Sequence, residues 1–407
     1  MKSHLVGIGG VGMSALAVAM LRTGHEVTGS DRDLTSPNVK MLNAFGIKVF
    51  PDDGSGVDSS LDEIVVSTAI EETNLDLVKA KNLSIKTIHR ASALDRTLSK
   101  KKLVAVAGTC GKTTVTALLG HILAEGGLDP FCVNGANVPG WEGAVRFGEG
   151  DFAVAEVDES DKSLTSFNPY AAIITNASAD HYSKEEMDEV FDRFIQGLPG
   201  PLVDGRTSAG LDRDEETSLQ IKKTLKMPGA HNIENALAAV SMAVHLGVDK
   251  MKAISSLATF RGVNRRLERY GERVYDDYAH NPEKLKAMWT ALDEMYPQGV
   301  CVIWRPHGYG PIKKMMDQLA AMFNETIRSQ DKLLLLPVYD AGGTADRSVS
   351  SEMLAEKIDE GKCVLVENHD EAFQYCSSHA ERYGAFVTSG ARDVKLPALA
   401  LRISGSV

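Results

Sequence analysis

Short apolar runs alternate with amphipathic stretches along the first hundred residues. A glycine turn at Gly9–Gly12 separates the first apolar run from a helical pattern over Met13–Arg22. The pattern predicts four strands, at His4–Ile8, His25–Gly29, Ile64–Ser67 and Ile85–Ile88. Strands that alternate with helices form a parallel sheet with right-handed crossovers. We therefore expect an α/β domain in this segment.

A second α/β segment begins near residue 100. It opens with the apolar run Leu103–Ala107, continues with predicted strands at Phe152–Glu156 and Ala171–Thr175, and contains a long helical pattern at Ala230–Leu246. The stretch Gly197–Lys226 is rich in glycine, proline and charge, and it predicts no clear element.

A third α/β segment follows a boundary near Arg261–Asn264. Its predicted strands are Val274–Asp276, Gly299–Trp304, Lys332–Pro337, Lys362–Val366 and Ala385–Thr388. The chain is therefore predicted to be an α/β protein of three domains, at residues 1–100, 101–262 and 263–407.

Composition narrows the class of function. Of the 407 residues, 43% are hydrophobic and 24% are charged, as in ordinary globular proteins. The formal net charge of -11 argues against nucleic acid as a partner, because nucleic-acid binding favours a basic surface. The sequence has no long apolar run typical of a membrane span, and its first residues lack the apolar core of a signal peptide. Its five cysteines form no CxxC pair, so we expect reduced thiols and a cytoplasmic enzyme.

The strongest local motif is the glycine loop Gly108–Thr114. It follows an apolar strand and precedes a helix that is expected to start near Thr113. Glycines let backbone N–H groups point at phosphate oxygens, and the start of a helix adds partial positive charge. Lys112 can reach the terminal phosphates, and the Thr113 hydroxyl can ligate Mg²⁺. The loop predicts an ATP site, in a shorter Gly-x-x-Gly-Lys-Thr form because residue 106 is Val106.

Polar side chains follow two of the strands that flank this loop. The first cluster contains Glu156, Asp158, Glu159 and Asp161, and the second contains Asn176, Asp180 and His181. Glu156 directly follows an apolar run and is the better Mg²⁺ ligand candidate, whereas its acidic neighbours also fit a solvated surface. Since the carboxyl ends of parallel strands meet at one edge of a sheet, we expect Glu156 and His181 to share one crevice.

The combination of motifs resembles the Mur ligase family over nearly the whole chain. The likeness rests on His4–Ser14, Gly29–Asp31, Val65–Ile70, His89–Ala91, Gly108–Thr114, Gly229–Asn235, Phe260–Arg266 and Asp276–Pro282. It implies an N-terminal Rossmann-like UDP-binding domain, a central P-loop ATPase-like domain and a C-terminal Rossmann-like domain. The turn Gly7–Gly12, with Asp31, would alone favour a dinucleotide and an oxidoreductase. The resemblance instead implies that this turn meets the diphosphate of a UDP-sugar.

The resemblance also assigns expected roles to residues. The UDP-sugar contacts are expected from Gly9, Gly10, Gly12, Asp31, Ser67 and Arg90, and a further substrate contact from His307. The ATP contacts are expected from Gly108, Thr109, Gly111, Lys112, Thr113, Thr114, Asn232, Asp276 and Asp277, with the two aspartates at the ribose. The expected metal ligands are Thr113, Glu156 and His181, and the expected catalytic residues are Lys112, Glu156, His181 and Arg266.

The activity implied by the resemblance is ATP-dependent amide formation in peptidoglycan precursor synthesis. The carboxylate of a UDP-sugar, UDP-N-acetylmuramate, would be activated as an acyl-phosphate and attacked by the amine of an amino acid, L-alanine. ATP and Mg²⁺ are the implied cofactors. The linker near Gly262 is the expected hinge for closure of the C-terminal domain. We expect a monomer or a dimer.

Three departures from the family pattern leave other functions open. The central domain is shorter than in the family, around Gly197–Lys226. The segment Arg305–Gly310 lacks the arginines that bind the carboxylate of the amino acid in the family, and Asn281–Lys284 differs from the family's His-Pro-Thr-Glu. A paralogue that acts on another acid or amine, or a non-catalytic paralogue that binds a nucleotide sugar, stays an alternative. Arg347 and Arg392 are candidates for the missing cation.

Overall fold

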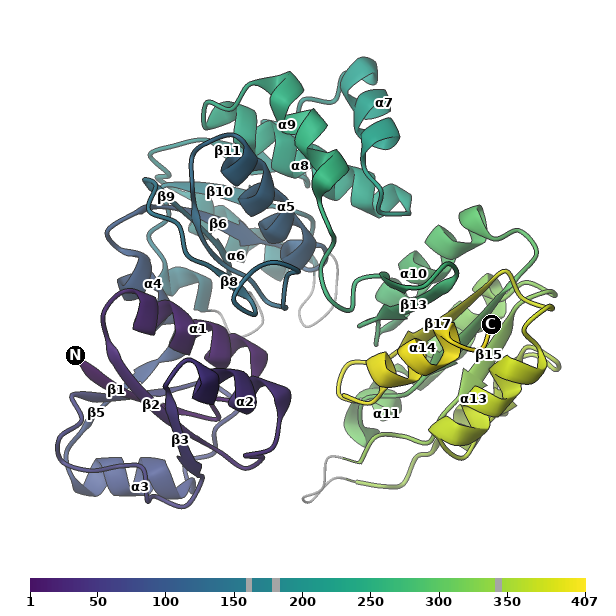
Figure 1. Ribbon diagram of the computed structural model, residues 1–407, viewed down its shortest axis with the longest axis horizontal. Coiled ribbons are helices and arrows are strands. Elements are labelled where there is room, and N and C mark those ends of the chain that lie inside the picture. Colours follow the sequence, from purple (N-terminus) through teal and green to yellow (C-terminus); the bar gives the residue numbers. More distant parts are fainter. Residues whose placement is uncertain (159–162, 178–183, 341–345) are drawn as a thin grey trace. The chain divides into compact units, whose positions relative to one another are not determined.

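The computed structural model describes residues 1–158, 163–177, 184–340 and 346–407 (Figure 1). Its strands form three sheets, one of five strands and two of six. The chain divides into two compact units: Met1–Lys226 with Ile233–Val263, and Met227–Asn232 with Asn264–Val407. The first unit contains two of the sheets and the second unit contains the third. Each sheet falls within one of the three predicted domain ranges, whose boundaries stay predictions.

The first sheet has the strand order β3-β2-β1-β4-β5, and all of its pairs are parallel. Its strands are β1 (Lys2–Val6), β2 (Glu26–Asp31), β3 (Lys48–Pro51), β4 (Glu63–Val66) and β5 (Lys86–His89). Its helices are α1 (Val11–Arg22), α2 (Pro37–Ala44), α3 (Leu75–Asn82) and α4 (Arg90–Leu98). Because every strand points the same way, the loops after β1, β2, β4 and β5 lie at one edge of the sheet.

The second sheet has the order β11-β10-β6-β9-β7-β8, and only β8 among its described strands is antiparallel to its neighbour. Its strands are β6 (Lys102–Ala107), β7 (Phe131–Val133), β8 (Val145–Arg146), β9 (Phe152–Glu156), β10 (Ala171–Ile174) and β11 (Leu202–Asp204). The helical elements of this region are α5 (Lys112–Glu125), η1 (Ser163–Ser166), α6 (Lys184–Ile195), α7 (Glu215–Thr224), α8 (Ala230–His245), α9 (Lys250–Ser256) and η2 (Leu257–Thr259). The strand before the glycine loop, β6, lies between β9 and β10.

The third sheet has the order β12-β13-β17-β14-β15-β16, with β12 antiparallel and the other pairs parallel. Its strands are β12 (Glu268–Tyr270), β13 (Val274–Asp277), β14 (Val300–Trp304), β15 (Lys332–Leu335), β16 (Cys363–Leu365) and β17 (Ala385–Ser389). Its helices are α10 (Pro282–Met295), α11 (Tyr309–Thr326), α12 (Ser351–Ala355), α13 (His369–Ser378) and α14 (Leu396–Ser404). Two apolar clusters form its core and contain the buried Trp289, Trp304 and Phe386.

The predicted α/β class and the alternation of strands and helices are confirmed. One prediction is wrong in detail: β1 ends at Val6, and α1 begins at Val11, so Gly12 lies in the first turn of a helix instead of in the turn before it. The reason is local, because Gly10 already has the extended backbone of a helix N-cap. The stretch Gly197–Lys226 contains β11 and α7, which its composition did not predict.

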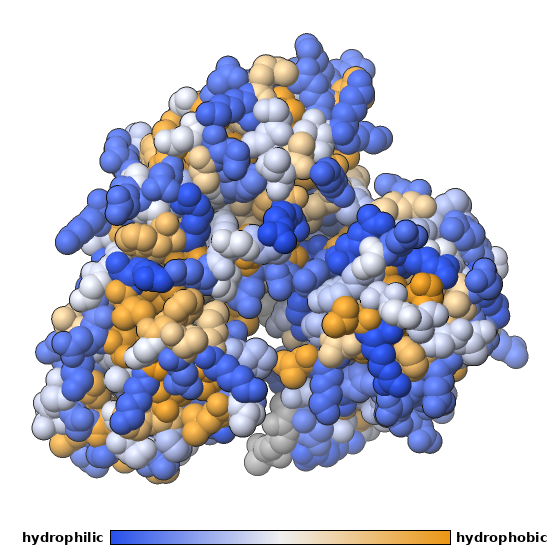
Figure 2. All heavy atoms as spheres, in the orientation of Figure 1, coloured by the Kyte–Doolittle hydropathy of each residue, from blue (hydrophilic) through white to orange (hydrophobic). Residues whose placement is uncertain are grey.

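None of the helices in the described ranges is long and apolar enough to cross a membrane. Hydrophilic residues cover most of the face drawn in Figure 2, and apolar residues occupy smaller patches on it.

Candidate active site

The glycine loop connects β6 to α5, as the sequence predicted. Gly108 has φ +124°, and a Cβ atom there would lie 2.1 Å from the Thr175 hydroxyl oxygen. Gly111 has φ +87° and is the N-cap of α5, which begins at Lys112. Both positions therefore require glycine, because an L side chain is strained at these angles and would collide at Gly108. The loop leads into the N-terminus of a fourteen-residue helix, a position that favours an anion.

Asn176 fastens this loop to the end of β10. Its side-chain oxygen accepts hydrogen bonds from the Thr109 hydroxyl at 2.6 Å and from the Cys110 N–H at 2.9 Å. Its side-chain nitrogen donates to the Cys110 carbonyl oxygen at 3.0 Å, and the Thr175 hydroxyl donates to the same oxygen at 2.6 Å. These bonds fix the loop conformation before any ligand binds. Asn176 was expected only to lie near the site, and its role as a loop clamp was missed.

Glu156 lies on the opposite side of the loop, at the end of β9. Its Oε1 accepts a hydrogen bond from the Thr113 hydroxyl at 3.2 Å, and its Oε2 accepts from the Gly135 N–H at 2.8 Å. A Cβ atom at Gly135 would lie 2.2 Å from Glu156 Oε2, so this close approach also requires glycine. The hydroxyl and the carboxylate are hard oxygen donors of the kind that Mg²⁺ prefers, and the pair fits that ion.

Asp158 lies near cations from both sheets of the first unit. The Lys112 Nζ atom lies 4.0 Å from Asp158 Oδ1, and Arg90 Nη2 lies 3.5 Å from Asp158 Oδ2. A small pocket is lined by Gly12 from α1 and Arg90 from α4, and by Glu156 at the end of β9 and Asp158 just after it. The structure therefore brings two predicted sugar-site residues, Gly12 and Arg90, and the predicted metal ligand Glu156 to one pocket.

The N-terminal glycine turn is tied to the end of β2. Asp31 accepts a hydrogen bond from the Gly9 N–H at 2.8 Å, and the Asn38 side chain donates to the Gly9 carbonyl oxygen at 2.8 Å. The Gly10 N–H donates to the Gly7 carbonyl oxygen at 3.1 Å. A Cβ atom at Gly9 would lie 2.8 Å from Asp31 Oδ2, which explains the glycine.

Two more predicted residues lie at the same edge of this sheet. Ser67 directly follows β4, and Arg90 begins α4 directly after β5. The space beside Gly12 is occupied by Arg90, whose Nη1 would lie 3.0 Å from a Cβ atom there. The predicted sugar-site residues therefore share one edge of the first sheet.

The motif at Gly229–Asn235 places its two asparagines differently. The Asn232 side chain donates to the Pro228 carbonyl oxygen at 2.6 Å and is 3% exposed. Asn235 lies against the phosphate loop, where its Oδ1 would be 2.4 Å from a Cβ atom at Gly111. The ATP contact expected from Asn232 stays a prediction. Asn235 is a loop neighbour that the sequence did not single out, although it belongs to the same motif.

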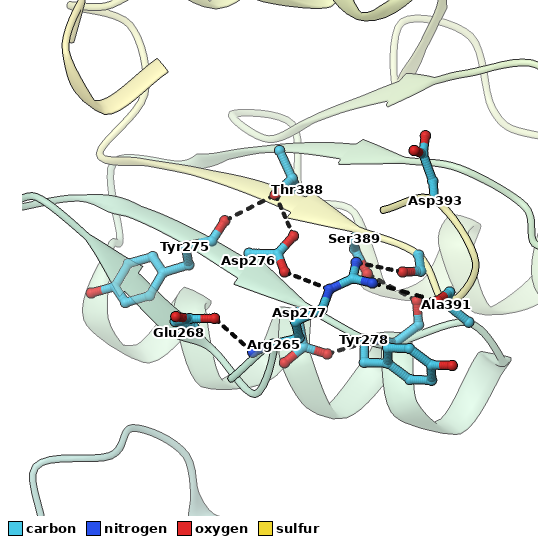
Figure 3. Close-up of polar contacts among 12 residues, drawn as sticks. Arg265, Glu268, Tyr275, Asp276, Asp277, Tyr278, Thr388, Ser389, Ala391 and Asp393 are labelled. Atoms are coloured by element: carbon cyan, nitrogen blue, oxygen red, sulfur yellow. Dashed lines mark hydrogen bonds and ion pairs between the residues drawn. The ribbon is translucent and has the colours of Figure 1, made fainter. Parts of the chain in front are cut away.

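Arg265 is bonded to several groups of the second unit (Figure 3). Arg265 Nε donates to Asp276 Oδ2 at 2.8 Å, and its Nη2 donates to the Gly390 carbonyl oxygen at 2.6 Å. Arg265 and Arg266 each place the guanidinium carbon 5.3 Å from the centre of the Tyr278 ring, a cation–π distance. Arg265 has φ +61°, a strained conformation for a non-glycine residue. Arg266, a predicted catalytic residue, directly follows this residue.

The predicted ribose residues, Asp276 and Asp277, are both buried. Asp276 is 0% exposed, accepts a hydrogen bond from the Thr388 hydroxyl at 2.6 Å, and has its pKa raised to about 6 by burial. Burial also raises the pKa of Asp277, which accepts from the Leu267 N–H at 2.7 Å and the Ala279 N–H at 2.8 Å. Both carboxylates organise the loops around β13. A ribose contact from either stays a prediction.

Two imidazoles meet at the carboxyl edge of this sheet. The rings of His280 and His307 are 4.8 Å apart. The His280 Nδ1 atom lies 2.9 Å from the Tyr278 carbonyl oxygen, which can only accept, so Nδ1 carries the proton. Burial lowers the pKa of His280 to about 3 and that of His307 to about 4. Both rings are therefore neutral near pH 7, and His280 offers Nε2 as an acceptor. His280 was not among the predicted site residues.

Four predicted residues lie outside the described residues: Glu159, Asp161, Asp180 and His181. Within the described ranges, no group of three or more His, Cys, Asp or Glu side chains is placed to hold a metal ion. The predicted role of His181 as a metal ligand and catalytic residue is therefore not described by the structure.

Three family models match the chain in succession. Residues 2–102 match "Mur ligase family, catalytic domain", residues 106–195 match "Mur ligase middle domain", and residues 265–392 match "Mur ligase, glutamate ligase domain". Among solved structures, a UDP-N-acetylmuramate–alanine ligase from Thermotoga maritima has a TM-score of 0.82 at 24% identity, covering 100% of this chain and 98% of that chain. That similarity shows the fold.

Relatives of known name are similar over most of their length. The UDP-N-acetylmuramate–L-alanine ligase of Rubrobacter xylanophilus is 36% identical, with 88% of this chain and 89% of that protein covered. The ligase of the same name from Carboxydothermus hydrogenoformans is 35% identical, with 91% and 90% covered. With these matches and a phosphate loop clamped between Asn176 and Glu156, the chain belongs to the Mur ligase family.

Proposed function

We infer that this chain is an ATP-dependent ligase that joins L-alanine to UDP-N-acetylmuramate in peptidoglycan precursor synthesis. The observation that carries this function is the 36% identity to a ligase of that name over 88% of the chain. The geometry supports it, because Gly12 and Arg90 of the predicted sugar site line one pocket with Glu156, the predicted Mg²⁺ ligand. The substrates are UDP-N-acetylmuramate, L-alanine and ATP. The reaction takes place in the cytoplasm.

The residues of the phosphate loop position ATP. The N–H groups at the start of α5 and the Lys112 ammonium group hold the phosphates, so that the carboxylate of the sugar attacks the γ-phosphate. Thr113 and Glu156 would hold Mg²⁺, which neutralises charge on the phosphate oxygens when it is bound. Arg90, 3.5 Å from Asp158 at the same pocket, is placed to orient the carboxylate of the sugar.

The second half of the reaction needs an amine and the exclusion of water. The acyl-phosphate is attacked by the amino group of the amino acid, and phosphate leaves from the tetrahedral intermediate. Water must be kept out, because it would hydrolyse the acyl-phosphate. Gly262, with φ +86°, lies beside the boundary between the two units and is the proposed hinge for closure.

A second candidate is a ligase of the same type that adds a different amine. The observation that favours it is the segment Arg305–Gly310, in which Gly308 and Gly310 have no side chain to bind a carboxylate. A non-catalytic binder is disfavoured, because Lys112, Thr113 and Glu156 lie together in a preformed phosphate loop.

Phosphate release from Mg-ATP tests the function. The assay contains UDP-N-acetylmuramate and each of the twenty amino acids in turn. Release that requires both the UDP-sugar and L-alanine is the expected result. Release that requires another amino acid would identify the second candidate, and no release with any of them would contradict the ligase.

Replacing Asn176 with alanine is expected to raise the KM for ATP about tenfold or more. The change removes three hydrogen bonds that hold the phosphate loop, each worth about 0.5–1.5 kcal/mol. The affinity for UDP-N-acetylmuramate, measured by titration calorimetry, should stay unchanged. Asn38→Ala is the reciprocal control, because its side chain holds the Gly9 turn. It should weaken UDP-sugar binding and leave the KM for ATP alone, and the opposite pattern would contradict both assignments.

A further inference from the structure

Three loops meet at the carboxyl edge of the third sheet. They follow β13, β17 and β14, which are adjacent, parallel strands in that order. The loops contain His280, Arg392 and His307 respectively. The Ser389 hydroxyl donates to the Ala279 carbonyl oxygen at 2.9 Å, and the Arg305 N–H donates to the Ser389 carbonyl oxygen at 3.0 Å, so the loops are bonded to one another.

The loop after β17 is fixed on both sides of Arg392. Before it, the Arg265 guanidinium donates to the Gly390 carbonyl oxygen at 2.6 Å. After it, Asp393 accepts from Arg305 Nη1 at 2.7 Å and is bonded to His369 Nε2 at 2.8 Å. Figure 3 shows this loop, with Ala391 beside Arg265 and Asp393 beyond it. A rigid backbone thus presents an exposed Arg392 side chain.

The Arg392 guanidinium lies beside the glycine that departs from the family pattern. Its Nη1 would lie 3.8 Å from a Cβ atom at Gly308, a van der Waals distance, so the guanidinium lies next to the place where a side chain at residue 308 would begin. It is also close enough to His307 to lower the pKa of that ring.

Other arginines of this unit already have carboxylate partners. Arg265 is bonded to Asp276, Arg305 to Asp393, and Arg347 to Asp340. Arg392 has no hydrogen bond or ion pair within the described ranges of the chain. The neighbouring imidazoles are neutral near pH 7, so they do not supply the positive charge that an anion needs.

We propose that Arg392 binds the α-carboxylate of the amino-acid substrate, supplying from the loop after β17 the guanidinium that residue 308 lacks. The proposal rests on the proposed function, which requires an amino acid in this unit. A guanidinium matches a carboxylate in a two-point, charge-assisted pair, which a lone ammonium group cannot form. The rings of His280 and His307 lie at the same edge of the sheet and are neutral, so Arg392 supplies the positive charge for the carboxylate.

A comparison of the amino acid with its amide tests this pairing. The variant Arg392→Gln removes the charge, and L-alaninamide lacks the matching carboxylate. We expect Arg392→Gln to lower kcat/KM for L-alanine about 10- to 100-fold, mainly through KM, and to leave kcat/KM for L-alaninamide unchanged. Arg392→Lys should recover part of the loss. Equal losses for both amines, or no loss for either, would overturn the proposal.

Arg347→Gln is the matched control, because Arg347 is an exposed arginine of the same unit that is already bonded to Asp340. It should leave the ratio of L-alanine to L-alaninamide turnover unchanged. Should another amino acid be the substrate, the same comparison is made with that amino acid and its amide.

A binding measurement separates this proposal from the proposed function. Saturation-transfer NMR of the full chain, with the amino acid or its amide and without ATP, does not depend on turnover. Preferential binding of the amino acid that Arg392→Gln abolishes would support the proposal even if no amine released phosphate. Equal binding of acid and amide by the unmodified chain would overturn it.

Discussion

Lys112→Ala is expected to reduce amino-acid-dependent phosphate release by roughly 10³-fold or more. Lys112 begins α5, its side chain is 13% exposed, and its Nζ atom donates to the Gly108 carbonyl oxygen at 2.7 Å. That bond holds the ammonium group beside the loop, where it can neutralise the negative charge on the phosphoryl group during its transfer. Alanine keeps the helix but removes the charge, so kcat should fall much more than stability. Single-turnover phosphate release measures the loss.

The same variant tests whether the two nucleotide sites are separate. The Gly9 turn belongs to the first sheet and is held by Asp31 and Asn38, not by the phosphate loop. Binding of UDP-N-acetylmuramate to Lys112→Ala should therefore match that of the unmodified chain in titration calorimetry. Lys101→Ala, a change at the other end of β6, is the control and should keep its activity. A collapse of UDP-sugar affinity in Lys112→Ala would contradict the separation.

The parts of the site that the sequence predicted are those fixed by local geometry. A strand, a glycine loop and a helix start are contiguous, so Lys112 and Thr113 followed from spacing alone. Glu156 followed because it ends an apolar strand, and the pairing of β6 with β9 places it beside Thr113. The contact of Gly135 with Glu156 and the approach of Asn235 to Gly111 join segments far apart in the chain, and no local pattern reports them.

Each described strand that the sequence missed is short: β3, β7, β8, β11 and β12 have two to four residues. The central strand β6 is almost fully buried and forms a continuous apolar run. By contrast, β3 is a four-residue edge strand without a fully buried residue, and β8 has two residues. Such strands depend on pairing with a distant neighbour, so single-chain periodicity does not mark them. The position of Arg392 beside Gly308 is likewise set by tertiary structure; the sequence named Arg347 and Arg392 as candidate cations but gave no ground to choose between them.

Arg265→Ala is expected to lower the free energy of unfolding of the second unit by about 3–5 kcal/mol, because it leaves a buried carboxylate without its cation. Asp276 is 0% exposed and Arg265 bonds it at 2.8 Å. Trp289 and Trp304 are buried in this unit, so their fluorescence in a Trp141→Phe background reports its urea unfolding. Lys286→Ala, which removes an exposed ion pair with Glu325, is the control and should cost at most about 1 kcal/mol.

The pH dependence of the stability lost in Arg265→Ala shows whether charge or packing causes the loss. Burial raises the pKa of Asp276 to about 6, so its folded form holds a proton more tightly than its unfolded form. Its contribution to stability is fully present below the unfolded pKa of about 4 and is lost as the pH rises through the folded pKa. Arg265 lowers the pKa of Asp276, so this pKa should be higher in Arg265→Ala, and the stability of the variant should keep falling to higher pH. The difference in the free energy of unfolding between the variant and the unmodified chain should therefore grow from acid to neutral pH. Adding Asp276→Asn should shrink the defect and flatten its pH dependence. A defect that is the same at every pH would assign the role of Arg265 to packing and to its bond with the Gly390 carbonyl oxygen, not to charge.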